Sequence, residues 1–529
     1  REPLDDYNDA DKVSDWAVSS MQAMVAAKAI TGSNGGNATR NLNPQETITR
    51  AEFAEMVYRL CKNFVQSSDS ATIRGGTIDG GVLVSKSGAK FNGTTIKGNV
   101  YISDAVGTGD VTFEDVKVEG NIYVRGSGER SVHLEGETTA NSVVFLNPYN
   151  ATRLVVEDEA KINGVLINNG VDEVTLEGKV GNVTMNVSDV DLTLEKAEAT
   201  NVVINSANSV VSLEEDSVVE TLSIASSSSG VTVNSEGKLN RLALMANNAK
   251  LNLDGTLDYL LIGAVNKLDL ELSKDIVLGA LDLHCSDSTI KVDSEVKTIN
   301  VSAFSEKLKL ELGKNAKVLA VGISSASTDL SVASEATVGT VTLDASKYKG
   351  TISSDLKTLV IGAGATEAEI TLAKDTDIET LTVNGNKGKI ITVAGSTVKD
   401  INITGKEVTV TGQGAVERVN VSSTADKANI DTPNTKVSNA GASEVKAGTI
   451  DLPPNKAYVI TSTGKDVIRN NDGTPDGDGD KTTGAAQEVA TVANFELAFA
   501  SGAAANDIDM SGKWSLDDLV TGITLTKNT

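Results

Sequence analysis

An arginine at the start of an expected helix is the first residue whose type and position suggest ligand binding. Residues 46–56 read ETITRAEFAEM, and Thr49 followed three residues later by Glu52 has the capping-box pattern of a helix N-terminus. Arg50 would then lie in the first helical turn, where a cation opposes the helix macrodipole. The position is unfavourable unless the guanidinium meets an anion. That anion is either a bound ligand or a neighbouring carboxylate such as Glu46 or Asp5.

A run of aspartates towards the end of the chain has the chemistry of a calcium site. Within NDGTPDGDGDKTTGAA (471–486) the carboxylates are hard oxygen donors, three of them at alternating positions. The run lacks the closing glutamate of an EF-hand loop, so a flexible acidic linker is the competing interpretation. Calcium is the cofactor that the sequence suggests, and its candidate ligands are Asp472, Asp476, Asp478 and Asp480.

Residues suited to catalysis are sparse elsewhere. The chain has two histidines, His133 and His284, and neither has a Ser-His-Asp or metal-ligand pattern around it. Cys61 and Cys285 are far apart in the sequence and have no metal-binding spacing, and Cys285 is in phase with inward-facing leucines. We therefore predict that the protein is not an enzyme.

The composition favours many short strands on an acidic protein. Of 529 residues only 3% are aromatic, and the formal net charge is −25. An acidic surface repels phosphate backbones, so we expect no nucleic-acid partner. No run of 18 apolar residues is present, so we expect no membrane insertion. The chain opens at Arg1 without a methionine, which is typical of a processed or partial product.

A repeat of about 20 residues fills the middle of the chain. Each unit contains an apolar-x-apolar triplet, and this period-two alternation places one face inward and the other outward. Asp282, between Leu281 and Leu283, is therefore expected to face outward. The first inward positions are Val100, Ile122, Val143, Val165, Val183, Val202, Leu222, Leu242, Leu260, Leu281, Ile299, Leu319, Val341, Leu359, Leu381, Ile401 and Val419.

Such a unit is too short to bury its own apolar face, whereas stacked units share a continuous core. The sequence therefore predicts a mainly β protein, a long parallel β-helix solenoid of about 19 coils of about 20 residues. An array of β-sandwiches is the alternative. Tyr101 and Tyr123 share a phase and would stack on adjacent coils, as a structural ladder more often than as a sugar site.

Different patterns occupy the two ends of the chain. Residues 1–65 read as a helical module, with an apolar helical face from Trp16 to Ala27, a turn at Gly32 and a second helix with Phe53 and Leu60 on one face. We expect the β-helix over 66–452, and a proline-containing then Gly/Asp-rich linker over 453–484. We expect a short helix (EVATVANFELAFASG, 488–502) and strands within 485–529, which either start another β-helix or link subunits.

The N-terminal module resembles the S-layer homology domain family. The matching residues are Tyr7-x-Asp9, Trp16-Ala17, the Ile30-x-Gly32 turn, Pro44 and Ile48-Thr49-Arg50-Ala51-Glu52. The resemblance implies non-covalent attachment to a secondary cell-wall polysaccharide, often pyruvylated, of a Gram-positive-type envelope. It implies that Asp9, Trp16 and Arg50 line the glycan groove. The family usually carries three such units packed together, and this sequence shows one.

These observations together predict a secreted, extracellular structural protein of the S-layer type. The helical module would anchor it to the cell wall, and the β-helix would self-associate into a lattice or fibre. A glycan-binding adhesin is the first alternative. A polysaccharide lyase or hydrolase is the second, because many parallel β-helices have such activities. They need convergent carboxylates on one face, and no such cluster stands out among the outward positions.

Overall fold

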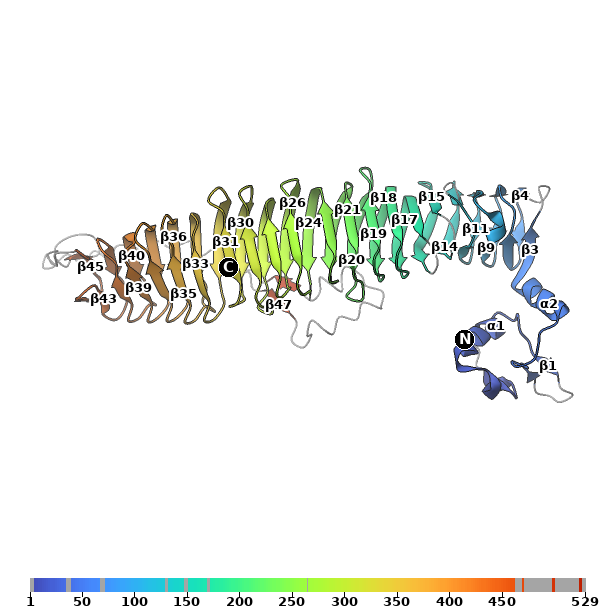
Figure 1. The fold of residues 1–529 in the computed structure, drawn as a ribbon, viewed down its shortest axis with the longest axis horizontal. Helices are drawn as coiled ribbons and strands as arrows, with labels where there is room; N and C mark the ends of the chain where they lie inside the picture. The colour runs from blue at the N-terminus through green and yellow to red at the C-terminus, as the bar shows by residue number, and fades with distance from the viewer. Residues whose placement is uncertain are drawn as a thin grey trace. The chain divides into compact units, whose positions relative to one another are not determined.

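The computed structural model describes residues 4–34, 40–66, 72–128, 132–146, 151–168, 172–263, 265–461, 469–470, 497–499 and 523–525. The chain divides into two compact units, Arg1–Glu220 and Thr221–Thr529, which are described separately. The protein is mainly β, with about 18 turns of β-solenoid and a short helical region at the N-terminus (Figure 1). The predicted fold class is confirmed at this level.

The helical region forms a small core that leaves its second helix outside. Leu4, Val13 and Val25 are buried together, and residues including Tyr7 and Leu42 pack against them. The elements are η1 (Leu4–Asp6), η2 (Ala10–Lys12), η3 (Asp15–Ala17), α1 (Val18–Ala26), β1 (Ser33–Asn34), β2 (Arg40–Asn41) and α2 (Arg50–Leu60). No residue of α2 is buried, so this helix does not contribute to the core.

The first unit continues into parallel coils. Strands one coil apart pair in register, as in Val111↔Val132 and Ile122↔Val143 (Figure 1). Cys61–Val65, which we expected in the helical module, pairs with Gly81–Val84 and is thus the first strand of this sheet. The elements are β3 (Cys61–Val65), β4 (Thr72–Arg74), β5 (Thr77–Ile78), β6 (Gly81–Val84), β7 (Ala89–Asn92), β8 (Thr95–Ile96), β9 (Val100–Ile102), η5 (Asp104–Val106), β10 (Val111–Glu114), β11 (Lys117–Val118), β12 (Ile122–Val124), β13 (Val132–Glu135), β14 (Thr139–Phe145), β15 (Thr152–Val156), β16 (Lys161–Ile167), β17 (Glu173–Met185), β18 (Asp191–Ile204), β19 (Val210–Leu213) and β20 (Val218–Ile224), the last of which crosses into the second unit.

Coils of the second unit have a short strand followed by a longer, bent one. The strands before the closing turns are β21 (Thr232–Ser235), β22 (Lys238–Leu244), β23 (Lys250–Leu253), β24 (Gly255–Ile262), β25 (Asp269–Leu272), β26 (Ile276–Leu283), β27 (Thr289–Val292), β28 (Glu295–Val301), β29 (Lys309–Leu312), β30 (Lys317–Ile323), β31 (Asp329–Val332), β32 (Thr337–Leu343), β33 (Lys349–Ile352), β34 (Leu356–Ile361), β35 (Glu369–Leu372), β36 (Asp377–Val383), β37 (Lys389–Thr392), β38 (Thr397–Ile403), β39 (Thr409–Gly412), β40 (Ala415–Val421), β41 (Asn429–Asp431) and β42 (Lys436–Asn439).

The predicted inward phase is confirmed along most of the repeat. Leu281, Ile299 and Val321 pair in consecutive coils and are buried, as is Cys285. Leu319 is the exception, because it is 69% exposed and Val321 takes the inward position. Val318 and Val321 are both buried, so the alternation breaks between them, at the bend of β30. The prediction was wrong there because Leu319–Val321 and Val321–Ile323 are both apolar-x-apolar triplets.

Asp282 corrects a second expectation. The residue lies in the outward phase as predicted, yet it is only 6% exposed. The hydroxyl of Tyr259 donates a hydrogen bond to Asp282 Oδ2 at 2.6 Å, and Asn300 Nδ2 donates to Asp282 Oδ1 at 2.8 Å. The prediction missed this burial because the covering side chains come from the preceding and following coils.

Side-chain ladders support the stacking of coils in the first unit. The rings of Tyr101 and Tyr123 are stacked, with centroids 5.2 Å apart and planes 8° apart, as the shared phase predicted. On the outer surface Asn141 Nδ2 donates to Asn121 Oδ1 at 2.8 Å, and Asn163 Nδ2 donates to Asn141 Oδ1 at 2.9 Å. The asparagine contact repeats on successive coils and the tyrosine stack joins one pair of coils, and both favour the observed alignment of neighbouring strands.

Strand direction reverses at the C-terminal end of the described coils. Lys436–Asn439 (β42) pairs antiparallel with Lys456–Val459 (β45), and Val445–Ala447 (β43) pairs antiparallel with Ile450–Leu452 (β44). A two-residue strand, Arg469–Asn470 (β46), pairs antiparallel with β45. These hairpins occupy the hydrogen-bonding edges of the last parallel coil.

Beyond them, Leu497–Phe499 (β47) pairs antiparallel with Ile523–Leu525 (β48). We expected a helix over 488–502, so that prediction is wrong for the three residues of β47. Leu497 and Phe499 alternate with Ala498 in the period-two pattern of a strand, and the pairing with β48 satisfies their backbone groups. The four aspartates predicted to bind calcium lie outside the described residues.

Candidate functional site

The N-terminus of α2 has the geometry that its sequence predicts. Thr49 Oγ1 accepts a hydrogen bond from the backbone N–H of Glu52 at 3.2 Å. The Glu52 carboxylate accepts in return from the backbone N–H of Thr49 at 2.8 Å, which completes a capping box. The hydrogen bonds that the carboxylate accepts from the backbone N–H and from the hydroxyl of Thr49 lower the pKa of Glu52. The cap fixes the direction in which Arg50, the first helical residue, leaves the backbone.

Arg50 is exposed and holds no carboxylate in the part of the chain that the structure describes. No Asp or Glu oxygen among those residues lies within 4.0 Å of its guanidinium, including those of Asp5 and Glu46. An arginine in this position opposes the helix dipole, and here no described side chain compensates it. Its five donors therefore face solvent in a fork suited to a planar carboxylate.

Exposed apolar side chains lie on α2 and just before it. Ile48, Phe53 and Tyr58 are all more than half exposed, although large apolar side chains are usually buried. A cation beside exposed apolar and aromatic groups is a common composition of binding surfaces.

Asp9 is a buried residue whose carboxylate binds the backbone of a neighbouring loop. It is 7% exposed, and its two carboxylate oxygens accept hydrogen bonds from the backbone N–H groups of Leu42 and Asn43, each at 2.7 Å. Burial alone would raise the pKa of Asp9, but these two donors and the nearby Lys12 outweigh it and lower the pKa. The carboxylate thus fastens the loop at residues 42–43 to the turn at residues 7–9.

Trp16 is presented to solvent rather than packed on the helical face where the sequence pattern placed it. It lies in η3, before α1 begins at Val18, and its side chain is 86% exposed. A tryptophan this exposed loses apolar burial, which is compensated when the ring stacks on a ligand. The structure records no contact that joins Trp16 to Arg50.

Two further contacts connect the loops of the module. Gly32 has φ of +71°, and a Cβ there would meet the Asn41 carbonyl oxygen and the Tyr7 ring. Arg59, in the last turn of α2, donates to Thr31 Oγ1 at 2.9 Å and pairs with Glu55. The sequence predicted the glycine turn from its position, whereas Arg59 carried no signal, because its partner Thr31 is 28 residues away.

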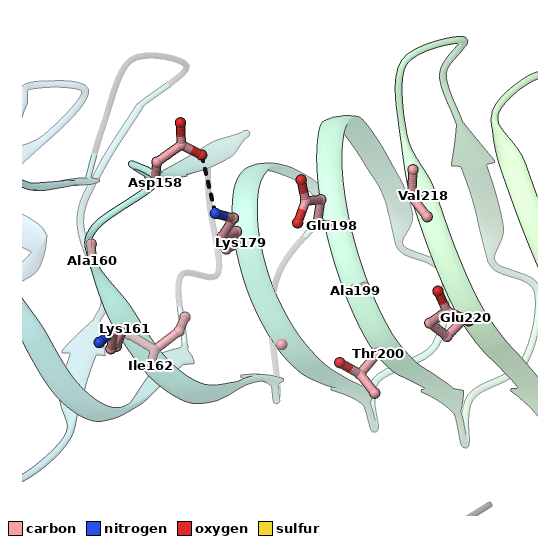
Figure 2. Close-up of a pocket in the computed structure, with 11 residues that line it drawn as sticks. Asp158, Ala160, Lys161, Ile162, Lys179, Glu198, Ala199, Thr200, Val218 and Glu220 are labelled. Atoms are coloured by element: carbon pink, nitrogen blue, oxygen red, sulfur yellow. Dashed lines mark ion pairs between the residues drawn. The ribbon is translucent and has the colours of Figure 1, made fainter.

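A separate surface groove lies on the solenoid of the first unit. It has a volume of about 660 Å³, and Lys161, Lys179 and Glu198 line it (Figure 2). Asp158 reaches towards Lys179, with an oxygen–nitrogen distance of 3.5 Å. Small residues such as Gly181, in the bulged part of β17, make the depression. Its lining is of mixed charge and includes no aromatic residue, so it lacks the stacking platform of a typical sugar site.

The described residues also contain a buried polar cluster that sequence reasoning missed. It consists of Tyr259, Asp282 and Asn300, with the Arg241 guanidinium carbon 5.7 Å from the Tyr259 ring centroid. Burial lowers the pKa of the neighbouring His284, which is half-buried. Nowhere among the described residues do three or more His, Cys, Asp or Glu side chains gather in a way that could hold a metal ion.

Comparison with known proteins supports the N-terminal assignment. Residues 6–54 match the S-layer homology domain family. No curated protein and no solved structure matches the chain. Within the described residues, no helix has the length and apolar character needed to cross a membrane.

The fold and the match together define a β-solenoid protein that carries an S-layer homology domain. Such a domain implies association with the cell surface and the cell wall. Arg50 lies within the matched residues, as do Asp9 and Trp16.

Proposed function

We propose that this chain is a cell-surface structural protein of the S-layer type, anchored through residues 6–54 to a secondary cell-wall polysaccharide. The observation that carries the proposal is the S-layer homology match over a module whose Arg50 is exposed and pairs with no described carboxylate. A guanidinium binds a carboxylate, such as that of a pyruvylated sugar, through two parallel hydrogen bonds. Trp16 would stack on a sugar ring, and Asp9 would hold the loop beside it.

The solenoid acts in this proposal as a spacer and as the self-associating part, in a lattice or fibre outside a Gram-positive-type cell. Its shared core and repeated contacts between coils stiffen each stack of similar small units. We propose no catalytic role and no nucleic-acid partner. Calcium binding by Asp472, Asp476, Asp478 and Asp480 stays a prediction.

A co-sedimentation assay with purified cell-wall sacculi tests the anchor. Arg50→Ala should raise the dissociation constant at least about tenfold, because a charge-assisted contact contributes about 1.5–3 kcal/mol. Arg74→Ala is the matched control: Arg74 is equally exposed but lies outside residues 6–54. Equal binding of wild type and Arg50→Ala would refute the assigned role of Arg50, and failure of wild type to bind would refute the anchoring.

Variants at the groove distinguish the adhesin alternative from the anchoring proposal in the same assay. An adhesin would bind glycans through the solenoid, so its binding would survive Arg50→Ala and would be lost on changing the groove at Lys161 and Lys179. The groove is the surface that this second function would use, and it lacks the aromatic platform of a typical sugar site.

A further inference from the structure

A row of charged residues that alternate in sign lies along one edge of the second unit. We name it the charged ridge, and it consists of Lys347, Glu367, Lys387, Glu407 and Lys427. The five residues are 20 positions apart, all are exposed, and all have positive φ, between 53° and 59°.

Backbone hydrogen bonds show that the ridge has one residue per coil. The N–H of Glu367 donates to the carbonyl oxygen of Asn386, the residue before Lys387, at 2.9 Å. The N–H of Lys387 donates in the same way to Lys406, the residue before Glu407, at 2.7 Å. Successive charges are therefore separated by roughly the strand spacing of 4.8 Å.

The choice of residues is not explained by the turn. A left-handed conformation is least strained for glycine or asparagine, and the corresponding turns of earlier coils contain Gly230 and Asn248, followed by Lys267, Asp287 and Lys307. From Lys347 onwards the same position carries only lysine or glutamate. The charged side chains are thus present in spite of the backbone strain, which indicates a role beyond closing the turn.

The five ridge residues also form no ion pairs with one another along the edge in the described part of the chain. In an earlier coil Lys307 Nζ lies 3.5 Å from Asp287. None of the five ridge residues has an opposite charge within 4.0 Å among the residues that the structure describes. Their side chains are therefore available to a partner.

The surroundings of the ridge reduce the repulsion between copies of this acidic protein. The four turns at 346–349, 366–369, 386–389 and 406–409 carry five lysines and three glutamates, a net charge of +2. The whole chain carries −25. Two copies that approach through these turns avoid the like-charge contact that most other surfaces would make.

We propose that the charged ridge pairs with the same ridge of a second copy of this chain, antiparallel, about a two-fold axis between Glu367 and Lys387. Lys387 of each copy then faces Glu367 of the other, and Lys347 faces Glu407. The strand residues Glu369 and Lys389 already pair within the chain, with 3.5 Å between Lys389 Nζ and Glu369 Oε2, and take no part in this contact. This pairing rests on the self-association proposed above and names the surface that performs it.

The alternation is what makes the ridge self-complementary. When the axis falls midway between Glu367 and Lys387, Lys387 faces a glutamate and so does Lys347, while Lys427 lies beyond the four paired positions. A row of one sign could not pair with itself at all. The contact is isologous and closes as a dimer. Exposed ion pairs are individually weak and are screened by salt, so the association should be salt-sensitive.

Charge exchange in the full chain tests the pairing by sedimentation velocity. Glu367→Lys with Glu407→Lys makes the ridge all positive, and Lys347→Glu with Lys387→Glu and Lys427→Glu makes it all negative. The matched control, Glu379→Lys with Glu417→Lys, makes the same change in net charge on the outer sides of β36 and β40. Circular dichroism melting checks that each variant is folded. If a multiple variant does not fold, the single substitution Lys387→Glu is measured in its place.

Wild type and control should be dimeric at low salt, and the dissociation constant should rise at least about tenfold at about 0.5 M salt, where the Debye length is about 4 Å. Each single-sign variant should be monomeric alone, and their equimolar mixture should be dimeric. A wild type that stays monomeric at low salt, or a single-sign variant that dimerises, would overturn the proposal. The variants should still bind sacculi, so loss of pairing is distinguishable from loss of the anchor.

Discussion

The hydroxyl of Tyr259 donates a hydrogen bond of 2.6 Å to a buried carboxylate oxygen of Asp282, 23 residues further along the chain. Burial and the neighbouring carboxylate raise the pKa of Tyr259, so its hydroxyl keeps its proton at neutral pH and remains a donor. Asn300 Nδ2 donates to the other oxygen of Asp282 at 2.8 Å. One carboxylate therefore joins three consecutive coils on the outer face.

Asp282→Ala should destabilise these coils by about 1–3 kcal/mol, because it leaves two donors without an acceptor. Amide hydrogen exchange over residues 255–305 measures this local free energy of opening, which a whole-chain melt would average out. Asp258→Ala is the matched control, since Asp258 is exposed in the same strand as Tyr259. Equal exchange in the two variants would contradict the assigned role of the carboxylate.

The bend of β30 gives a second prediction. Val321→Asp should destabilise its coil by roughly 3 kcal/mol or more, because it buries an unpaired charge. Leu319→Asp, two residues away and 69% exposed in wild type, should change stability by less than about 0.5 kcal/mol. Denaturant unfolding followed by circular dichroism compares the two variants. The opposite order would restore Leu319 to the core and refute the position of the bend.

Two glycines with nearly equal φ give a third prediction. Gly178 has φ of +79° and Gly255 has φ of +78°, but a Cβ on Gly178 would collide with the carbonyl oxygen of Val156, whereas one on Gly255 meets nothing within 4 Å. Gly255→Ala should therefore cost only the left-handed strain, about 1–2 kcal/mol. Gly178→Ala should cost more, because backbone atoms must move. The melting temperatures of the two variants check the order, and a smaller loss for Gly178→Ala would exclude the close approach.

Asp9 gives a pH-dependent prediction. Its pKa in the folded chain is below its unfolded value of about 3.9. Because the folded pKa is depressed, its stabilisation is fully present above the unfolded pKa and is lost as the pH falls through the folded pKa. Asp9→Asn should therefore speed amide exchange at Leu42 and Asn43 at neutral pH. The difference from wild type should vanish in strong acid, and a difference independent of pH would show that the carboxylate charge is not involved.

The repeat was predictable because the apolar-x-apolar alternation within each coil indicates which residues face inward. In Leu281-Asp282-Leu283 the alternation alone identifies the two core positions, and the structure confirms both. At residues 317–323 the same rule had two solutions, Leu319 with Val321 or Val321 with Ile323, and only the bend of the strand selects the second. A local sequence pattern does not show where a strand bends, because packing determines the position of the bend.

The candidate site was less accessible to sequence reasoning. The Thr49–Glu52 cap was predicted because its four residues are contiguous. The hydrogen bonds of Asp9 were not, because Leu42 and Asn43 lie more than 30 residues away. The apolar helical pattern placed Trp16 on a packed helix face, but its side chain is exposed. The reason is that α1 begins only after it, at Val18.

The antiparallel strands β44 and β45 have a consequence for how such a chain can change in length over evolution. A coil appended beyond the hairpins would meet an antiparallel strand instead of a parallel coil like its own. Duplicating or deleting coils in the interior avoids this mismatch, because each coil there meets neighbours like itself. Such events are constrained by parity: one duplicated coil in the charged ridge would place two like charges side by side, whereas a duplicated pair would preserve the alternation.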